Sequence, residues 1–235
     1  MHGNPNVWLA GPEAAQHFDP AQLTDEERAR MARLRRSARR QEFAVSRALR
    51  THARLALVRP ASESLSHSGG YAALAQAQPS LRVGVDLELH RPRDVLATAR
   101  GAFSEAEVGA LQTVADPERE RLFYTMWTVK EALAKALQLH LLDALRDCRL
   151  VVDGPEWQVR VPQSVSGCVA VYQPRPELTL AVACIGASLP IDSWTWPPQR
   201  TASWPLIAAI SLAAADAPPA ADPGTAAAAR GAARA

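Results

Sequence analysis

Lysine is almost absent from this sequence, although basic residues are common. Only two of its 26 lysine and arginine residues are lysines, Lys130 and Lys135. Both lie close to Glu131 in the stretch WTVKEALAKAL, residues 127–137. This placement singles out one short segment as a candidate site of chemistry.

Cysteine and long apolar runs are also scarce. The three cysteines, Cys148, Cys168 and Cys184, are far apart and lack C-x-x-C spacing, which argues against a disulfide framework and against a zinc site. The N-terminal residues lack a basic segment followed by an apolar run, and no apolar stretch of membrane-spanning length precedes residue 190. These absences predict a reduced, cytoplasmic protein that is neither exported nor membrane-spanning.

The remaining composition is typical of a globular chain. Of 235 residues, 48% are hydrophobic, which is enough to bury the core of one large domain or two small ones. Residues 1–60 carry 11 arginines and 6 acidic residues, and this positive charge favours an anionic ligand. We interpret these arginines as a solvated helix face rather than a nucleic-acid surface, because no stacking platform or nucleic-acid motif accompanies them.

Capping-box spacings mark the expected helices. Thr24–Glu27 is one such box, and residues 24–57 are expected to form two helices joined near Ser37. Ser104–Glu107 is another, and a longer helix is expected over residues 117–142.

Short β-rich segments lie between and after these helices. YAALAQ and LRVGVDLEL, within residues 71–89, read as two strands, and four further runs over residues 148–186 read as an antiparallel sheet. The order of helices and strands predicts an α+β fold. The predicted divisions are an N-terminal half (1–95), a C-terminal half (96–189) and an Ala/Pro-rich tail (190–235) that is disordered, in which WPLIAAISLAAA is either a short helix or a docking segment.

Three carboxylates are candidates for one site. Asp86 and Glu88 are two residues apart on an expected strand and so point to the same face. Trp127, Glu131 and Lys135 share one face of the expected long helix. Carboxylates without histidine or thiolate nearby favour a hard ion such as Mg²⁺, and hence phosphoryl chemistry.

Each of these signals also has a plain structural interpretation. A D-x-E on a strand is most often an exposed polar face, and Glu131 with Lys135 can be an ordinary helix ion pair worth about 0.2–0.5 kcal/mol. The stretch LSHSGG, residues 65–70, reads equally as a simple turn.

Four motifs in order carry a family resemblance. SHSGG (66–70), VGVDLE (83–88), FSEAE (103–107) and FYTMWTVKEALAK (123–135) together resemble the signature of the 4′-phosphopantetheinyl transferases. They look like the longer, single-chain type that activates siderophore, peptide and polyketide synthases. The resemblance implies two similar α+β halves with coenzyme A between them. It also implies Mg²⁺-dependent transfer of the phosphopantetheine arm to a serine of an acyl or peptidyl carrier protein, releasing adenosine 3′,5′-bisphosphate.

The resemblance also implies roles for individual residues. Asp86, Glu88 and Glu131 would surround the metal, with Glu88 acting directly or through water. Glu131, or a water that it holds, would accept the proton of the serine. Lys135 would meet the pyrophosphate, where a slim ammonium fits better than a guanidinium fork. The remaining contacts to coenzyme A would come from His67 to the 3′-phosphate, from Ser66 beside it, from Lys130 at the rim, and from Arg40 as the candidate among Arg39, Arg40 and Arg47.

One departure from the family pattern leaves a second hypothesis open. A G-K-P segment usually precedes the SHS motif, and here LVRPASESLSHS passes directly from Arg59 to Ser66. The alternative is therefore a catalytically impaired relative that binds coenzyme A or a carrier protein as a scaffold. The expected partner is an acidic carrier, whose charge would suit the basic N-terminal region. No nucleic-acid or membrane partner is expected, and the protein is expected to be a monomer.

Overall fold

The computed structural model describes residues 5–56, 62–153, 156–186, 192–195, 199–200 and 204–214. Helices and strands both contribute to the core, so the predicted α+β class is confirmed. In chain order the elements are β1 (Asn6–Ala10), the 3₁₀ helices η1 (Pro12–His17) and η2 (Pro20–Gln22), α1 (Asp25–Arg33), α2 (Ser37–Ala56), β2 (Ser62–Ser68), β3 (Tyr71–Ala77), β4 (Arg82–Leu89), α3 (Val95–Ala102), α4 (Glu105–Thr113), α5 (Glu118–Leu137), α6 (Leu141–Asp147), β5 (Arg149–Asp153), β6 (Glu156–Val161), β7 (Gly167–Arg175), β8 (Leu178–Ile185), β9 (Asp192–Thr195), β10 (Gln199–Arg200) and β11 (Leu206–Ala214).

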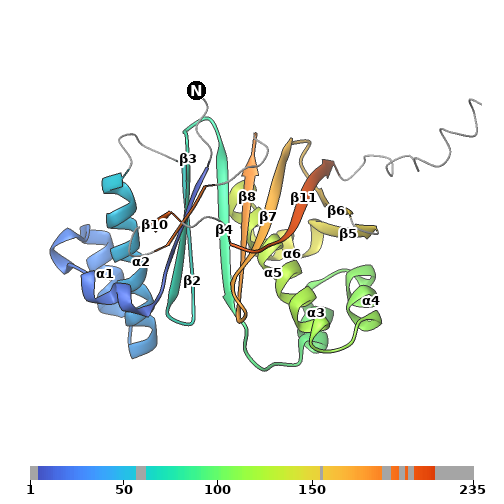
Figure 1. Ribbon diagram of the computed structural model, residues 1–235, viewed down its shortest axis with the longest axis horizontal. Helices are drawn as coiled ribbons and strands as arrows, with labels where there is room; N and C mark the ends of the chain where they lie inside the picture. The colour runs from blue at the N-terminus through green and yellow to red at the C-terminus, as the bar shows by residue number, and fades with distance from the viewer. Residues whose placement is uncertain are drawn as a thin grey trace, which may run out of the picture.

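The strands form two sheets that lie between helices (Figure 1). The first sheet has the strand order β10-β9-β1-β3-β2, and the second has the order β4-β8-β7-β11-β6-β5. Side chains of both sheets share one core, in which Val7 and Ala75 of the first sheet meet Val85 and Leu180 of the second. Helix α2 packs on the other face of the first sheet, and α5 packs on the other face of the second. The molecule therefore has four layers.

Side chains of strand β4 point alternately into the core between the sheets and toward the candidate site. Val83, Val85 and Leu87 are buried between the two sheets. Because successive strand side chains point to opposite faces, Asp86 and Glu88 point instead toward α5. This matches the prediction that the two carboxylates share a face.

Gly84 brings helix α5 close to this strand. A Cβ atom on Gly84 would lie 1.9 Å from the carbonyl oxygen of Ala132, a distance that no side chain can occupy. Glycine therefore permits the close crossing of β4 by α5. The crossing brings Glu131 and Lys135, which flank the contact residues of α5, next to the acidic face of β4.

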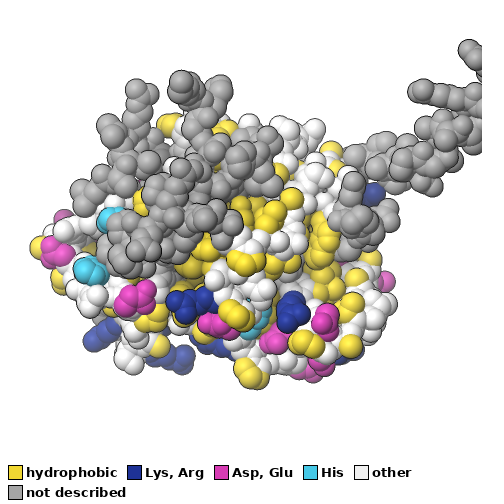
Figure 2. All heavy atoms as spheres, in the orientation of Figure 1, with side chains coloured by type: hydrophobic (Ala, Val, Ile, Leu, Met, Phe, Trp, Pro, Cys, Tyr) yellow, Lys and Arg dark blue, Asp and Glu magenta, His cyan; other side chains and the backbone are white. Residues whose placement is uncertain are grey.

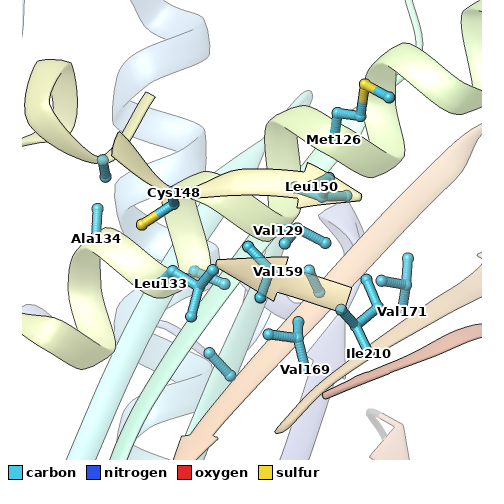
Figure 3. Close-up of a cluster of buried hydrophobic side chains, with 14 of the residues drawn as sticks. Met126, Val129, Leu133, Ala134, Cys148, Leu150, Val159, Val169, Val171 and Ile210 are labelled. Carbon is cyan, nitrogen blue, oxygen red and sulfur yellow. The ribbon is translucent and has the colours of Figure 1, made fainter. Parts of the chain in front are cut away.

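The other side of α5 packs into the second sheet. Figure 3 shows Val129 and Leu133 of this helix beside Val159 of β6, and Met126 and Ile210 belong to the same buried cluster. These helical positions are three and four residues apart and so form one apolar stripe. Burial of this stripe fixes the rotation of the helix that carries Glu131.

The predicted helix starts are confirmed, and one helix end differs. Thr24–Glu27 and Ser104–Glu107 form complete capping boxes. Helix α5 ends at Leu137, not near Leu142, because Gln138 adopts the left-handed conformation with φ 57°. The stretch SHSGG contributes to strand β2, and its two glycines form the turn with positive φ values of 60° and 86°.

Part of the predicted tail is an interior strand, so that part of the prediction was wrong. Residues 206–214 form β11, which pairs with β7 in antiparallel and with β6 in parallel orientation. Ala208 and Ile210 are buried in the core. Small alanine side chains conceal the alternation of buried and exposed positions that marks a strand. Residues 192–195 also form a strand, β9, which pairs with β1. Residues 215–235 lie outside the described residues.

The sheets do not follow the predicted boundary between residues 95 and 96. Strand β4 precedes that boundary, yet it pairs along its whole length with β8 of the second sheet. The division of the chain into two similar halves stays a prediction.

Charged side chains of both signs intermix on the molecular surface. On the face drawn in Figure 2, lysine and arginine side chains alternate with acidic ones along the lower edge. The described side chains that are visible on this face form no single extended basic surface of the kind that follows a nucleic-acid backbone. Within the described ranges, none of the helices combines the length and the apolar composition that crossing a bilayer requires.

Candidate metal and phosphate site

Three carboxylates from two elements meet at one point. Asp86 and Glu88 come from β4 and Glu131 comes from α5, and one carboxylate oxygen of each lies within 4.8 Å of the others. Asp86 is buried, and Glu88 and Glu131 are partly exposed. The structure therefore brings together the three residues predicted to hold a metal.

Strand β2 supports this cluster with a row of serines. Ser66 Oγ donates to Asp86 Oδ1 at 2.8 Å, and Ser68 Oγ donates to Glu88 Oε2 at 2.9 Å. The backbone N–H groups of Val85 and Leu89 donate to Ser64 Oγ and Ser68 Oγ. Strand β4 is an edge strand of its sheet, so the hydroxyls satisfy backbone groups that lack a strand partner.

Lys135 reaches the cluster from α5. Its Nζ donates to the carbonyl oxygen of Val85 at 2.7 Å and to Asp86 Oδ1 at 2.9 Å. Its side chain is 32% exposed. The ammonium therefore lies beside the carboxylates and keeps access to a ligand, and its contact with a pyrophosphate stays a prediction.

The carboxylates perturb one another. Burial and the neighbouring Asp86 raise the pKa of Glu131 to about 7, against the lowering effect of Lys135. Burial and Asp86 also raise the pKa of Glu88. The ionised forms of these carboxylates are therefore unfavourable so close together. A bound cation would stabilise them.

One buried carboxylate oxygen of this cluster lacks a partner that a cation would supply. Oδ2 of Asp86 is buried and has no hydrogen-bond partner among the residues that the structure describes. Leaving such an oxygen unpaired is costly. The donors are carboxylate oxygens alone, which suits Mg²⁺ better than a softer metal. Asp86, Glu88 and Glu131 would hold that ion.

Lys130 does not belong to this site. The prediction that it contacts coenzyme A at the rim was wrong. Its side chain is 0% exposed, and Nζ lies 2.9 Å from Glu107 Oε1. Nζ also donates to the carbonyl oxygen of Leu145 at 2.7 Å. Glu107 in turn accepts the N–H of Leu150. The lysine lies about 100° around α5 from Glu131, and this rotation places it in the core.

A second candidate pocket lies on the opposite face of β2. Ser66 and His67 are adjacent in the strand and so point to opposite faces. His67 lines a cavity of about 300 Å³ together with Arg30, Arg47 and Arg50. Its Nδ1 lies 3.6 Å from Glu42 Oε2 and has no hydrogen-bond partner among the described residues. Burial lowers the pKa of His67, and Glu42 opposes this shift.

The structure distinguishes the three arginines proposed for the coenzyme. Arg40 is not among the residues that line the cavity, and its Nε donates to the carbonyl oxygen of Leu34 on an exposed surface. Arg39 is bonded to Glu42. Arg47 is buried in the cavity wall, and its Nη1 lacks a hydrogen-bond partner in the described part of the chain. Arg47, not Arg40, has the position of an anion-binding side chain.

A comparison with known families matches the segment that carries the carboxylates. The model of the 4′-phosphopantetheinyl transferase superfamily matches residues 82–166. The predicted family resemblance is confirmed. The matched segment includes the three clustered carboxylates and both lysines, whereas Ser66, His67 and Arg47 precede it.

Individual relatives match over part of their length. The 4′-phosphopantetheinyl transferase HetI of Nostoc sp. (strain PCC 7120) is 35% identical over 74 residues, which are 31% of this chain and 31% of HetI. The 4′-phosphopantetheinyl transferase Sfp of Bacillus subtilis is 31% identical over 135 residues, which are 55% of this chain and 57% of Sfp. This chain therefore spans less than two thirds of these relatives.

Several supporting residues escaped the sequence prediction. Ser64 and Ser68 hold β4, Glu107 anchors Lys130, and Arg30 and Arg50 line the second pocket. The serines had a visible signal, since Ser62, Ser64, Ser66 and Ser68 recur with the period of a strand. Arg59, which stands where the stretch before the SHS motif begins, lies outside the described residues.

Proposed function

We propose that this protein transfers the 4′-phosphopantetheine arm of coenzyme A to a serine of an acyl or peptidyl carrier protein. The observation that carries the proposal is the cluster of Asp86, Glu88 and Glu131 with Lys135 beside it. It lies inside the segment that matches the transferase superfamily. Three carboxylates and one ammonium form a site for a cation and a diphosphate.

The reaction assigns a task to each of these side chains. The serine oxygen attacks the phosphorus that bears the pantetheine, and the bond from that phosphorus to the bridging oxygen breaks, so that adenosine 3′,5′-bisphosphate leaves. Glu131, or a water that it holds, is the candidate base that accepts the serine proton. Lys135 stabilises the charge that develops on the leaving phosphate. A bound Mg²⁺ would add Lewis-acid polarisation of the phosphate oxygens.

The pocket of His67 and Arg47 is the proposed site of the 3′-phosphate of coenzyme A. Arg30, Arg47 and Arg50 line it together with Glu63; Arg47 is ion-paired with Glu27, and Arg50 is ion-paired with Glu27 and Glu63. The buried Nη1 of Arg47 and Nδ1 of His67 lack partners among the described residues, and a phosphate would supply acceptors for both. Strand β2 would then lie between the two ends of the coenzyme, with Ser66 on the metal side and His67 on the 3′-phosphate side.

The test is intact-mass spectrometry of an apo carrier protein incubated with this protein, coenzyme A and Mg²⁺. We expect the carrier to gain the mass of one phosphopantetheine arm, and a chelator to abolish the gain. Absence of any gain with carriers of several types, from a protein that is folded and binds coenzyme A by calorimetry, would instead support the scaffold alternative. The choice of Mg²⁺, a monomeric state and a cytoplasmic location remain part of this proposal.

A further inference from the structure

The pocket of His67 and Arg47 is supported by a carboxylate that does not line it. Oε1 of Glu27, on helix α1, lies 2.9 Å from Nε of Arg47 and 3.3 Å from Nη1 of Arg50. Both arginines line the cavity, whereas Glu27 is not among its lining residues. Glu27 therefore binds the arginines without filling the space that an anion would occupy.

Two contacts fix the guanidinium group of Arg47. Its Cζ lies 4.7 Å from the ring centroid of Phe43, and its Nε is ion-paired with Glu27. The side chain is 10% exposed, and its Nη1 has no hydrogen-bond partner in the described part of the chain. Because the guanidinium is planar and rigid, a fixed face and a fixed Nε edge also fix the direction of the Nη1 donor. An anion in the cavity would supply the acceptor that this buried donor lacks.

Arg47 depends on Glu27 more than Arg50 does. Arg50 is also ion-paired with Glu63 at 3.1 Å, and Gln76 donates to Glu63 at 3.0 Å. Glu27 is the one ion-pair partner of Arg47 among the described residues. Loss of the charge on Glu27 would therefore release Arg47, while Arg50 would keep a carboxylate partner.

Glu27 also attaches helix α1 to the pocket. None of the residues of α1 is buried, and within the described ranges both ion pairs between α1 and α2 come from Glu27. Arg30 is three residues further along α1, on the same face, and it lines the cavity. The other oxygen of Glu27, Oε2, accepts the N–H of Thr24 at 3.1 Å in the capping box. One oxygen thus caps the helix and the other holds the arginines, so mutation can separate the two tasks.

We infer that Glu27 is a positioning residue that makes this pocket selective for a ligand with a 3′-phosphate. The identity of that ligand, coenzyme A, rests on the proposed function. Glu27 acts through Arg47 and Arg30 rather than by contact with the ligand. A phosphate monoester gains most from a guanidinium that is already oriented, because less side-chain freedom is lost on binding. The arrangement of the arginines, as well as their charge, therefore distinguishes coenzyme A from its 3′-dephospho form.

The test changes the charge of Glu27 and keeps the helix cap. In Glu27→Gln, the amide oxygen still accepts the N–H of Thr24, since glutamine also serves at this position of a capping box. The KM for coenzyme A is expected to rise about tenfold, whereas the KM for 3′-dephospho-coenzyme A and both kcat values are expected to stay within about twofold. The matched control is Glu26→Gln, which makes the same chemical change at the exposed neighbouring position. This control is expected to leave the ratio of the two KM values unchanged.

A binding measurement makes the test independent of transfer. Calorimetry with adenosine 3′,5′-bisphosphate and adenosine 5′-monophosphate is expected to show a preference for the bisphosphate that falls about tenfold in Glu27→Gln. Glu27→Asp keeps the charge but withdraws the carboxylate from Arg47 by one methylene group, so it is expected to lose part of the preference. Arg47→Lys keeps the charge but lacks the Nε edge, and its loss should not add to that of Glu27→Gln in the double variant, because both changes disrupt one interaction.

Thermal melts establish that each variant is folded. An unchanged preference in both Glu27 variants would overturn the inference. Tighter binding of the bisphosphate would also overturn it, because this result would show that Glu27 competes with the phosphate. An unmodified protein that prefers the bisphosphate but transfers nothing would overturn the proposed function and leave the inference standing. Transfer without any preference for the bisphosphate would overturn the inference alone.

Discussion

The two lysines of this chain form the same bond in different surroundings. Lys135 Nζ lies 2.9 Å from Asp86 Oδ1, and Lys130 Nζ lies 2.9 Å from Glu107 Oε1. Around Asp86 one carboxylate oxygen has no hydrogen-bond partner in the described part of the chain, and two further carboxylates lie close. Around Glu107 both oxygens are hydrogen bonded. The first pair can take up a ligand, whereas the second pair is complete in itself.

The difference shows that the surroundings, and not the residue type, decide the role of each lysine. Lys130 connects α5 to Glu107 of α4 and to Leu145 of α6, so it holds helices in place. Lys135 connects α5 to strand β4 and remains 32% exposed, so it can meet a substrate. The predictions below separate catalysis from stability at these two pairs.

The largest effect is expected from Asp86→Ala. This change removes the central carboxylate of the cluster, so metal-dependent transfer should be lost. Folding should be nearly normal, because the buried oxygen without a partner is removed as well. Carrier mass and the thermal melting curve measure the two effects, and persistent transfer in this variant would show that the metal assignment is wrong.

Lys130→Met is expected to act on stability. It leaves Glu107 as a buried charge without its partner, at a cost of about 3–5 kcal/mol in the free energy of unfolding. Urea denaturation measures this loss. In the control variant, Lys130→Met combined with Glu107→Gln, the charge is removed and the N–H of Leu150 keeps an acceptor, so part of the lost stability should return. A single variant as stable as the original protein contradicts the structural role.

Lys135→Met is expected to show the opposite pattern. Its pair with Asp86 is partly exposed, so the free energy of unfolding should change by less than about 1 kcal/mol. The rate of transfer should fall by about 10²–10³, because the positive charge beside the leaving phosphate is lost. Steady-state kinetics with coenzyme A tests this prediction. A large loss of stability with an unchanged kcat would show that Lys135, like Lys130, has a structural role.

The smallest effect is a pH dependence of the metal-free protein. Burial and Asp86 raise the pKa of Glu131 from 4.5 to about 7, so the folded chain binds more protons than the unfolded chain between these values. The free energy of unfolding is therefore expected to fall as the pH rises from 4.5 to about 7. Thermal melts in a chelator measure it, and Glu131→Gln should flatten the dependence. An identical slope in both proteins would exclude Glu131 as its cause.

Local patterns predicted the site better than they predicted its surroundings. The period of a strand placed Asp86 and Glu88 on one face, and the period of a helix placed Glu131 with Lys135. These relations need only neighbouring residues. The burial of Lys130 depends on Glu107, which is 23 residues away, and no local pattern reports such a pairing.

The same limit explains the error over the tail. Strand β11 lies between β7 and β6, so its place depends on pairings with distant segments. Its alanine-rich sequence resembles a low-complexity tail, since small side chains give weak periodicity. The serines of β2 differ from β11, because their alternation is visible in the sequence. Only the strand that they contact could not be predicted.

The central claim is that Asp86, Glu88 and Glu131 hold a divalent metal while Glu107 and Lys130 do not. Crystals soaked with Mn²⁺ and coenzyme A would test this directly through the anomalous scattering of manganese, which accepts the same oxygen ligands as Mg²⁺. The account predicts one strong peak between the three carboxylates, bridged to the diphosphate. No peak there, or a peak elsewhere on the molecule, would contradict it.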